Sequence, residues 1–398
     1  MRGTHAVLPE HGFTTSALMP PEQAVIAFLS RAALVAPSVQ NVGIADSFGR
    51  ILARNIAADA HYPAIARSTM DGFAVRSGDL PGALRLAGDV LMGRVFERAL
   101  RAGETVRIPT GGALPEGADA VVPIEDAVLE GDRLTVCGAV APLDCITPPG
   151  EDMRAGESVL RAGRRIGGAQ ASVLATLGIA QVPVFRRPRI GVISSGDELV
   201  GVGDLRGPAQ IRDSNRYAVG AALYRHGCDA VALPAVSDRP GALEAALKDA
   251  LGACEAVIIT GGSSVGLADR TPAAIDATGS PGVIVHGLRV KPGKPTVLAS
   301  IAGKAVIGLP GNPTSALMIL EAVAAPIIAA LTGRAGRAFT IEAVLERDAP
   351  SRAGWTWFVP VTLRDDGARY LARPLAIRSS STSLLARAHG FLTIDEEK

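Results

Sequence analysis

Between residues 188 and 333, apolar and polar positions alternate in blocks that predict strands followed by helices. The runs RIGVISS, CDAVALPAV and AVIIT are almost wholly apolar, which is typical of buried strands. DSNRYAVGAALYRHG, capped by Asp213 or Ser214, and GALEAALKDALG have helical periodicity, and AVIGLPGNPTSALMILEAV predicts a strand followed by a helix. This alternation predicts a doubly wound parallel sheet with its functional loops at the carboxyl ends of the strands.

The pattern differs on both sides of this region. Residues 51–150 are rich in Gly and Pro and contain short β-prone runs, GFAV, TVRI, DAVVPI and RLTV. Helices are expected at roughly 21–36 and 168–178, and strands at FTIEAVLER, WTWFVPVTL and RYLARPL. Trp355 and Trp357 share one face by period two, and we interpret them as packing residues.

These patterns predict a multidomain α/β protein with four parts. The expected parts are a helical, connecting lobe at 21–50 plus 151–180, a β-rich domain at 51–150, a central α/β domain at 181–333 and a small C-terminal β domain at 334–398.

Composition excludes some classes of partner. The 398 residues carry 40 Lys plus Arg and 39 Asp plus Glu, so no global charge attracts nucleic acid or an anionic membrane. The four cysteines and six histidines lack zinc or disulfide spacing, which favours a reducing cytoplasm. The apolar stretch at 315–333 contains Glu321 and Pro326 and is interpreted as a buried helix.

A glycine-rich loop follows the strand AVIIT. Its sequence, ITGGSSVGLADRT, predicts a tight turn whose backbone N–H groups surround an anion such as a phosphate. A carboxylate beside a phosphate is favourable when a cation lies between them. In SSGDEL, either Asp197 or Glu198 could cap a helix while the other reaches a metal, and hard oxygen ligands of this kind suit Mg²⁺. The candidate residues in the glycine-rich loop are Gly261, Gly262, Ser263, Ser264, Gly266 and Asp269.

Two further loops add positive charge and helix N–H groups. KPGKP places Lys291 and Lys294 on a proline-stiffened turn. LPGNPTS leads from a strand into a helix N-terminus, which attracts anions through exposed N–H groups and the helix dipole. Its candidate residues are Pro310, Gly311, Asn312 and Ser315. GxxxxGK[ST] and GxGxxG are both absent, which disfavours a P-loop NTPase and a dinucleotide dehydrogenase.

Asp71 in STMDGFAV and Thr110 in PTGGALPEGADAVV stand beside glycines in the β-rich region, where turn chemistry alone explains them. On the α/β domain, SSGDEL, Asp238, Asp269 and the two lysines belong to loops that we expect on the same sheet edge.

Seven motifs together resemble a known family. MDGFA, TGGALPEGADAVV, SSGDEL, IRDSNR, TGGSSVGLAD, KPGKP and GLPGNPTS occur in the order found in the molybdopterin molybdenumtransferases, the MoeA and gephyrin E-domain group, over about residues 21–375. The resemblance implies an enzyme that takes adenylylated molybdopterin and molybdate, releases AMP with Mg²⁺, and leaves molybdenum on the dithiolene. It also implies that the α/β domain is of the molybdopterin-binding type.

The same resemblance implies roles for individual residues. Asp71, Thr110, Glu198, Asp238, Asp269 and Lys291 match functional positions of the family, and Glu198 with Asp269 is expected to bind Mg²⁺. The family forms homodimers with the site between the α/β domain of one subunit and the β-rich domain of the other, so Asp71 is expected to serve the partner's cleft. A cytoplasmic protein with transient molybdoenzyme-maturation partners is expected.

The chain departs from the family pattern in two places. GEDMRAGES supplies Arg154, expected to bind substrate, but the usual R-x-x-G-E-D is one residue shorter here and has Ser158 in place of Asp. AIARS replaces a typical P-F-D-N-S before Met70. The alternatives are a diverged paralogue that holds or delivers the cofactor, and an adenylyltransferase acting one step earlier, which would not require the 51–150 domain.

Overall fold

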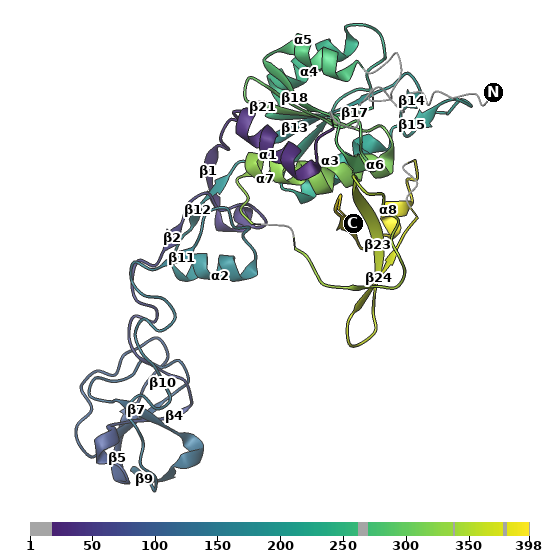
Figure 1. Ribbon diagram of the computed structural model, residues 1–398. Helices are drawn as coiled ribbons and strands as arrows, with labels where there is room; N and C mark the ends of the chain where they lie inside the picture. Colours follow the sequence, from purple (N-terminus) through teal and green to yellow (C-terminus); the bar gives the residue numbers. More distant parts are fainter. Residues whose placement is uncertain (1–17, 262–269, 337–338, 377–379, 398) are drawn as a thin grey trace, which may run out of the picture. The chain divides into compact units, whose positions relative to one another are not determined.

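The computed structural model describes residues 18–261, 270–336, 339–376 and 380–397 (Figure 1). These residues form two compact units. Unit 2 consists of Arg54–Ala162 and Ser172–Ile179, and unit 1 of the remaining described residues. Each unit has its own apolar core.

The central sheet of unit 1 has six strands in the order β16-β13-β17-β21-β20-β18. Four of them are parallel, whereas β20 and β18 are antiparallel to their neighbours. The reversal follows from a two-residue hairpin, Ala302 and Gly303, in which both residues have positive φ, as a turn between twisted strands requires. The strands are β13 Arg189–Ser195, β16 Asp229–Ala232, β17 Ala256–Gly261, β18 Pro281–His286, β20 Val297–Ile301 and β21 Lys304–Leu309. The doubly wound α/β fold is confirmed, but the expectation of an entirely parallel sheet was wrong.

Helices cover both faces of this sheet, because each apolar strand contributes side chains to both sides. One core contains residues of α1 Pro21–Arg31, α3 Asn215–Arg225, α6 Pro313–Ile319 and α7 Ala325–Thr332. The other contains residues of α4 Ala242–Ala253 and α5 Thr271–Thr278. Ala24 and Phe28 of α1 are fully buried in the first core. The proposed boundaries of the four parts, including the helical lobe, stay a prediction.

The helix from Pro313 to Thr332 is long and apolar enough to cross a membrane by length and composition alone. Its apolar residues nevertheless lie in the core of unit 1, as the sequence predicts for a buried helix. A π segment, η5 Leu320–Ala324, links α6 to α7 just before Pro326. Proline lacks an N–H and crowds the carbonyl four residues earlier, so the wider π turn accommodates it within the helix.

A second sheet of unit 1 is formed at the C-terminus in the order β19-β23-β24-β22, with β25 beside β23. β23 Thr356–Asp365 and β24 Tyr370–Pro374 match predicted strands, whereas only β22 Val344–Leu345 forms from FTIEAVLER. The sequence did not indicate β25 Gly390–Ile394 or the pairing of β19 Val290–Lys291 with β23. The remaining elements of this unit are β1 Val39–Gly43, β12 Gln181–Phe185, β14 Leu199–Val200, β15 Ile211–Arg212 and α8 Leu384–Arg387.

Unit 2 is β-rich, as predicted, and its main sheet has the order β7-β4-β6-β5-β9-β8. Phe73 and Val75 enter one core while Ala74 enters the other, so β4 is buried on both faces by simple alternation. The strands of this sheet are β4 Gly72–Val75, β5 Gly82–Asp89, β6 Glu104–Ile108, β7 Ala120–Pro123, β8 Val128–Glu130 and β9 Arg133–Val136. Two short two-stranded sheets are formed by β2 Ile56–Ala57 with β11 Ser158–Leu160 and by β3 Arg67–Ser68 with β10 Ile146–Thr147. The helix α2 Gly168–Thr176 contains residues of both units.

Candidate functional site

The carboxyl ends of β13, β17 and β21 lie side by side at one edge of the central sheet. Ser195 pairs with Gly261, and Thr260 pairs with Leu309. Since β20 is antiparallel to β21, it begins at this edge, directly after the KPGKP turn. The loops after the three parallel strands and the KPGKP turn therefore share the edge, as the sequence predicts. We call it the C-terminal edge.

The strand ends approach one another more closely than a side chain would allow. Gly261 has a φ of +95°, and a Cβ there would overlap the carbonyl oxygen of Ser195. A Cβ on Gly311 would lie 3.3 Å from Cα of Gly261. Asn215, at the start of α3, donates from Nδ2 to the Gly311 carbonyl at 2.7 Å. Glycine at these positions permits backbone N–H groups of neighbouring loops to converge.

Asn215 was not among the predicted site residues, although it lies in the IRDSNR motif that carries the family resemblance. Asp213, two residues earlier, accepts a hydrogen bond at Oδ1 from the Arg216 main-chain N at 3.1 Å and so caps α3. This favours Asp213 over Ser214, whose side chain makes no capping bond.

The predicted residues Gly262, Ser263, Ser264, Gly266 and Asp269 lie outside the described residues. Gly261 and Arg270, on the two sides of that segment, are described. The guanidinium of Arg270 donates to the main-chain oxygen of Asp238 at 2.7 Å. Arg270, the first described residue after that segment, therefore contacts the loop of Asp238.

Asp238 is tied to the loop that follows β13. Its carboxylate accepts a hydrogen bond from the Ser195 hydroxyl at 3.3 Å and one from the Asp197 main-chain N at 3.4 Å. In return, the main-chain N of Asp238 donates to the Asp197 carboxylate at 3.2 Å. The predicted proximity of SSGDEL and Asp238 is thus confirmed, and both carboxylates remain exposed to solvent.

Glu198 is also exposed, and its carboxylate lies over Cα of Gly196, where a Cβ would overlap it. The described part of the chain contains no group of three or more His, Cys, Asp and Glu side chains placed to hold a metal. Glu198 and Asp238 nevertheless offer oxygen atoms only, from adjacent loops, and this donor set fits Mg²⁺ better than a softer metal. The second predicted ligand, Asp269, belongs to the segment outside the described residues.

The LPGNPTS loop leads directly into a helix. Asn312 is the N-cap of α6, Pro313 occupies the first helical position, and the Ala316 main-chain N donates to the Asn312 oxygen at 2.9 Å. Pro310 and Ser315 are buried, whereas Gly311 and Asn312 are exposed. The helix begins at the C-terminal edge, so its first N–H groups can face an anion there.

The two lysines of the KPGKP turn each meet a tryptophan of β23 or of the segment just before it. Nζ of Lys291 lies 4.6 Å from the centroid of the Trp357 ring, and Nζ of Lys294 lies 5.9 Å from that of Trp355. Sequence reasoning singled out all four residues but did not bring the pairs together, because the contacts join distant parts of the chain.

In unit 2, Asp71 and Thr110 are direct neighbours. One oxygen of the Asp71 carboxylate accepts from the Thr110 main-chain N at 2.6 Å and from its hydroxyl at 2.9 Å. These hydrogen bonds lower the pKa of the Asp71 carboxyl below its usual value, because they stabilise the charged form. The pair therefore presents a fixed, ionised carboxylate on the surface of unit 2.

Arg154 lies in an exposed turn of the same unit. The turn is closed by the Glu157 carboxylate, which accepts from the Arg154 main-chain N at 3.0 Å. Ser158, at the position where the resemblance led us to expect Asp, is exposed and pairs with Ala57 in a short strand. Glu157 thus performs a structural role in this shortened loop.

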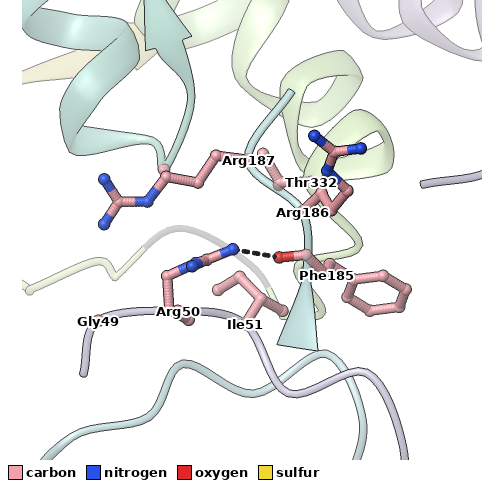
Figure 2. Close-up of a pocket in the computed structure, with 8 residues that line it drawn as sticks. Gly49, Arg50, Ile51, Phe185, Arg186, Arg187 and Thr332 are labelled. Atoms are coloured by element: carbon pink, nitrogen blue, oxygen red, sulfur yellow. Dashed lines mark hydrogen bonds between the residues drawn. The ribbon is translucent and has the colours of Figure 1, made fainter. Parts of the chain in front are cut away.

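Figure 2 shows a small pocket elsewhere in unit 1 that contains none of the predicted site residues. In it, Nη2 of Arg50 donates to the Phe185 carbonyl at 3.0 Å. The Arg187 guanidinium lies over the ring of Tyr224 and 3.9 Å from the Asp229 carboxylate. These contacts already engage two arginine side chains, and we take the C-terminal edge as the candidate site.

Family models match nearly all of the chain. The MoeA N-terminal region (domain I and II) matches residues 19–178, a probable molybdopterin binding domain matches residues 191–330, and the MoeA C-terminal region (domain IV) matches residues 342–398.

Curated relatives and solved structures agree with these matches. A molybdopterin molybdenumtransferase of Bacillus subtilis is 36% identical over 89% of this chain and 85% of its own length. One from Haemophilus influenzae is 36% identical over 74% of this chain and 73% of its own. A crystal structure of a molybdopterin biosynthesis MoeA protein from Pyrococcus horikoshii has a TM-score of 0.80 and 32% identity, and covers 96% of this chain and 95% of its own.

The order of the seven motifs and the matches of family models and named relatives over most of the chain lead to one family. This chain belongs to the molybdopterin molybdenumtransferase (MoeA) family.

Proposed function

We propose that this chain inserts molybdenum from molybdate into adenylylated molybdopterin, with release of AMP. The observation that carries the proposal is the alignment of the carboxyl ends of three parallel strands with a two-lysine turn at one sheet edge, in a chain that matches named transferases over most of its length. In this reaction an oxygen of water or of molybdate displaces AMP from the phosphoanhydride, and the two dithiolene sulfurs replace oxygen ligands of molybdate, which leave as water.

The substrate carries several negative charges, and the edge supplies groups of opposite sign. Lys291 and Lys294 would bind phosphate or molybdate oxygens, and the first turn of α6 with the glycine loops would donate N–H groups. Pro310 and Ser315 would complete the surroundings of the substrate at this edge, and Arg154 of unit 2 remains a separate candidate for substrate binding. The buried Pro310 and Ser315 would act by shaping the loop.

We propose that Glu198 and Asp269 hold Mg²⁺, with Asp238 orienting the loop between them through its contact with Asp197. When bound, Mg²⁺ would offset the charge of the phosphoanhydride. The carboxylates would otherwise repel the phosphates, so the metal and the lysines act together.

Asp269→Asn tests the metal role. It should reduce Mg²⁺-dependent AMP release far more than it weakens binding of adenylylated molybdopterin, because the amide keeps the shape but loses the charge. Asp249→Asn, an equal change at an exposed position of α4, serves as the control and should leave both unchanged. Equal losses of binding and AMP release in Asp269→Asn would contradict the metal assignment.

We further propose a homodimer in which Asp71 and Thr110 of one subunit complete the site of the other. Asp71→Asn and Lys291→Ala subunits should each be inactive alone. After co-refolding in equal amounts, half of the dimers are mixed, and each of these has one site with both residues intact, so about a quarter of wild-type activity should return. A site built within a single subunit would give no recovery.

The other two functions find less support. An adenylyltransferase would not require the region that the MoeA N-terminal model matches at residues 19–178. A cofactor-holding paralogue was suggested by Ser158, but the relatives reported above are named transferases, and Glu157 closes the shortened turn. The balanced charge and the four free thiols fit a reducing cytoplasm, which we propose as the site of action.

A further inference from the structure

The lysine turn is joined to the C-terminal sheet by a two-residue strand pairing. β19 is parallel to β23, with Val290 opposite Thr356 and Lys291 opposite Trp357. Directly opposed residues in neighbouring strands point to the same face, so the lysine side chain and the indole meet. The ammonium of Lys291 lies 4.6 Å from the Trp357 ring centroid, within the range of a cation–π interaction.

The backbone that carries the lysines has little freedom. Gly293 has a φ of +118°, and a Cβ there would overlap the Ile319 side chain of α6. The Thr296 hydroxyl donates to the Gly293 oxygen at 2.6 Å, and the Leu288 main-chain N donates to the Lys294 oxygen at 2.8 Å. The remaining freedom lies in the two long lysine side chains, which are the most costly to order on binding.

Trp357 is fixed independently of the lysines. Trp357 is only 8% exposed and sits in the middle of the sheet, paired on its other side with Ile394 of β25. The guanidinium of Arg289, next to β19, is bonded to the Glu396 carboxylate at 2.7 and 2.9 Å, which ties this strand to the segment after β25. The Trp357 ring is therefore a rigid platform, and the indole is the best aromatic partner for a cation.

We propose that Trp357 and Trp355 are positioning residues that hold the ammonium groups of Lys291 and Lys294 ready for the oxyanion. The inference rests on the proposed function, in which these lysines bind phosphate or molybdate oxygens. The Lys291 ammonium over the ring face keeps its charge, and those of its N–H groups that point away from the ring can donate to an anion. Because each side chain is already ordered, less rotamer entropy is lost when the anion binds.

The test compares Trp357→Leu, Trp357→Phe and Phe358→Leu. Phe358 is the next residue on β23 and is 4% exposed, so its change disturbs the same strand without touching a lysine. With molybdate as the titrant, Trp357→Leu should raise Kd about 2- to 5-fold, the conversion of a typical exposed cation–π energy at tenfold per 1.4 kcal/mol. Trp357→Phe should restore most of the affinity, and Phe358→Leu should leave Kd unchanged.

The second readout is the NMR spectrum of the reductively ¹³C-methylated protein. In the wild type the Lys291 signal should be shifted upfield by the ring current of Trp357, and Trp357→Leu should move it to the position of a solvated lysine. Trp355→Leu should do the same for Lys294. An unshifted Lys291 signal in the wild type, or equal Kd changes in Trp357→Leu and Phe358→Leu, would overturn the proposal. An upfield signal without any molybdate binding would instead refute the proposed function and keep the positioning contact.

Discussion

Replacing Gly261 with Ala should destabilise unit 1 and open the C-terminal edge. The left-handed φ of +95° disfavours a side chain by about 1–2 kcal/mol. The added Cβ would also overlap the Ser195 carbonyl oxygen, which belongs to the backbone and cannot turn away, and forced overpacking costs about 1–3 kcal/mol more. The free energy of unfolding should therefore fall by about 2–5 kcal/mol.

Tryptophan emission is a selective probe for this experiment, because both tryptophans of the chain lie in unit 1. With a urea dependence of about 3 kcal/mol per molar, the midpoint of the emission change should drop by about 1 M. Gly252→Ala is the matched control. Gly252 lies in α4 with nothing within 4 Å of an added Cβ, so the change should be neutral or stabilising by up to about 1 kcal/mol.

The same variant should lose AMP release, since the Ser195 and Gly311 loops would have to move apart. If Gly261→Ala unfolds within about 0.5 kcal/mol of the wild type, within the range of ordinary surface changes, the close approach of β13 and β17 is not as described.

Three further predictions concern the cores and the ionisable groups. Phe28→Ala should lower the free energy of unfolding of unit 1 by about 3–5 kcal/mol in the same emission assay, because the ring is fully buried beneath the sheet. Hydrogen bonding from Arg98 lowers the pKa of Glu104 to about 2. The contribution of Glu104 to the stability of unit 2 is therefore present above its unfolded pKa and is lost as the pH falls from about 4.5 to 2. Glu104→Gln should flatten this dependence of stability on pH, measured by denaturation followed by circular dichroism. Burial raises the pKa of the Cys228 thiol to about 12, so at pH 8 it should react with a disulfide reagent far more slowly than the exposed Cys137, and equal rates would contradict the burial.

Strand positions were predictable wherever an apolar run is bounded by turn residues. β13, β17 and β21 follow from RIGVISS, AVIIT and AVIGL, and the parallel order of the first two places their loops at one edge. The direction of each strand was harder to predict, because the hydrophobic periodicity is the same for parallel and antiparallel strands. The reversal of β20 depends on a two-residue turn, Ala302 and Gly303, whose φ values the sequence does not reveal.

Contacts between segments that are far apart in the chain could not be predicted from the sequence. Trp355 and Trp357 were expected to share one face by period two, but nothing local shows that β19, only two residues long, pairs with β23, the strand of Trp357. Asp71 and Thr110 were both named, yet their hydrogen bonds depend on how β4 and the loop after β6 meet. A sequence supplies residue types for a site more readily than the pairs that fix them.

The central claim is that this chain transfers molybdenum to adenylylated molybdopterin at the C-terminal edge. The most direct test incubates the purified protein with adenylylated molybdopterin, molybdate and Mg²⁺, and measures both the AMP released and the molybdenum cofactor able to activate an apo-molybdoenzyme. The account predicts one AMP for each active cofactor in the wild type, and loss of both products in Lys291→Ala. Tight binding of the substrate without AMP, or AMP without active cofactor, would contradict it.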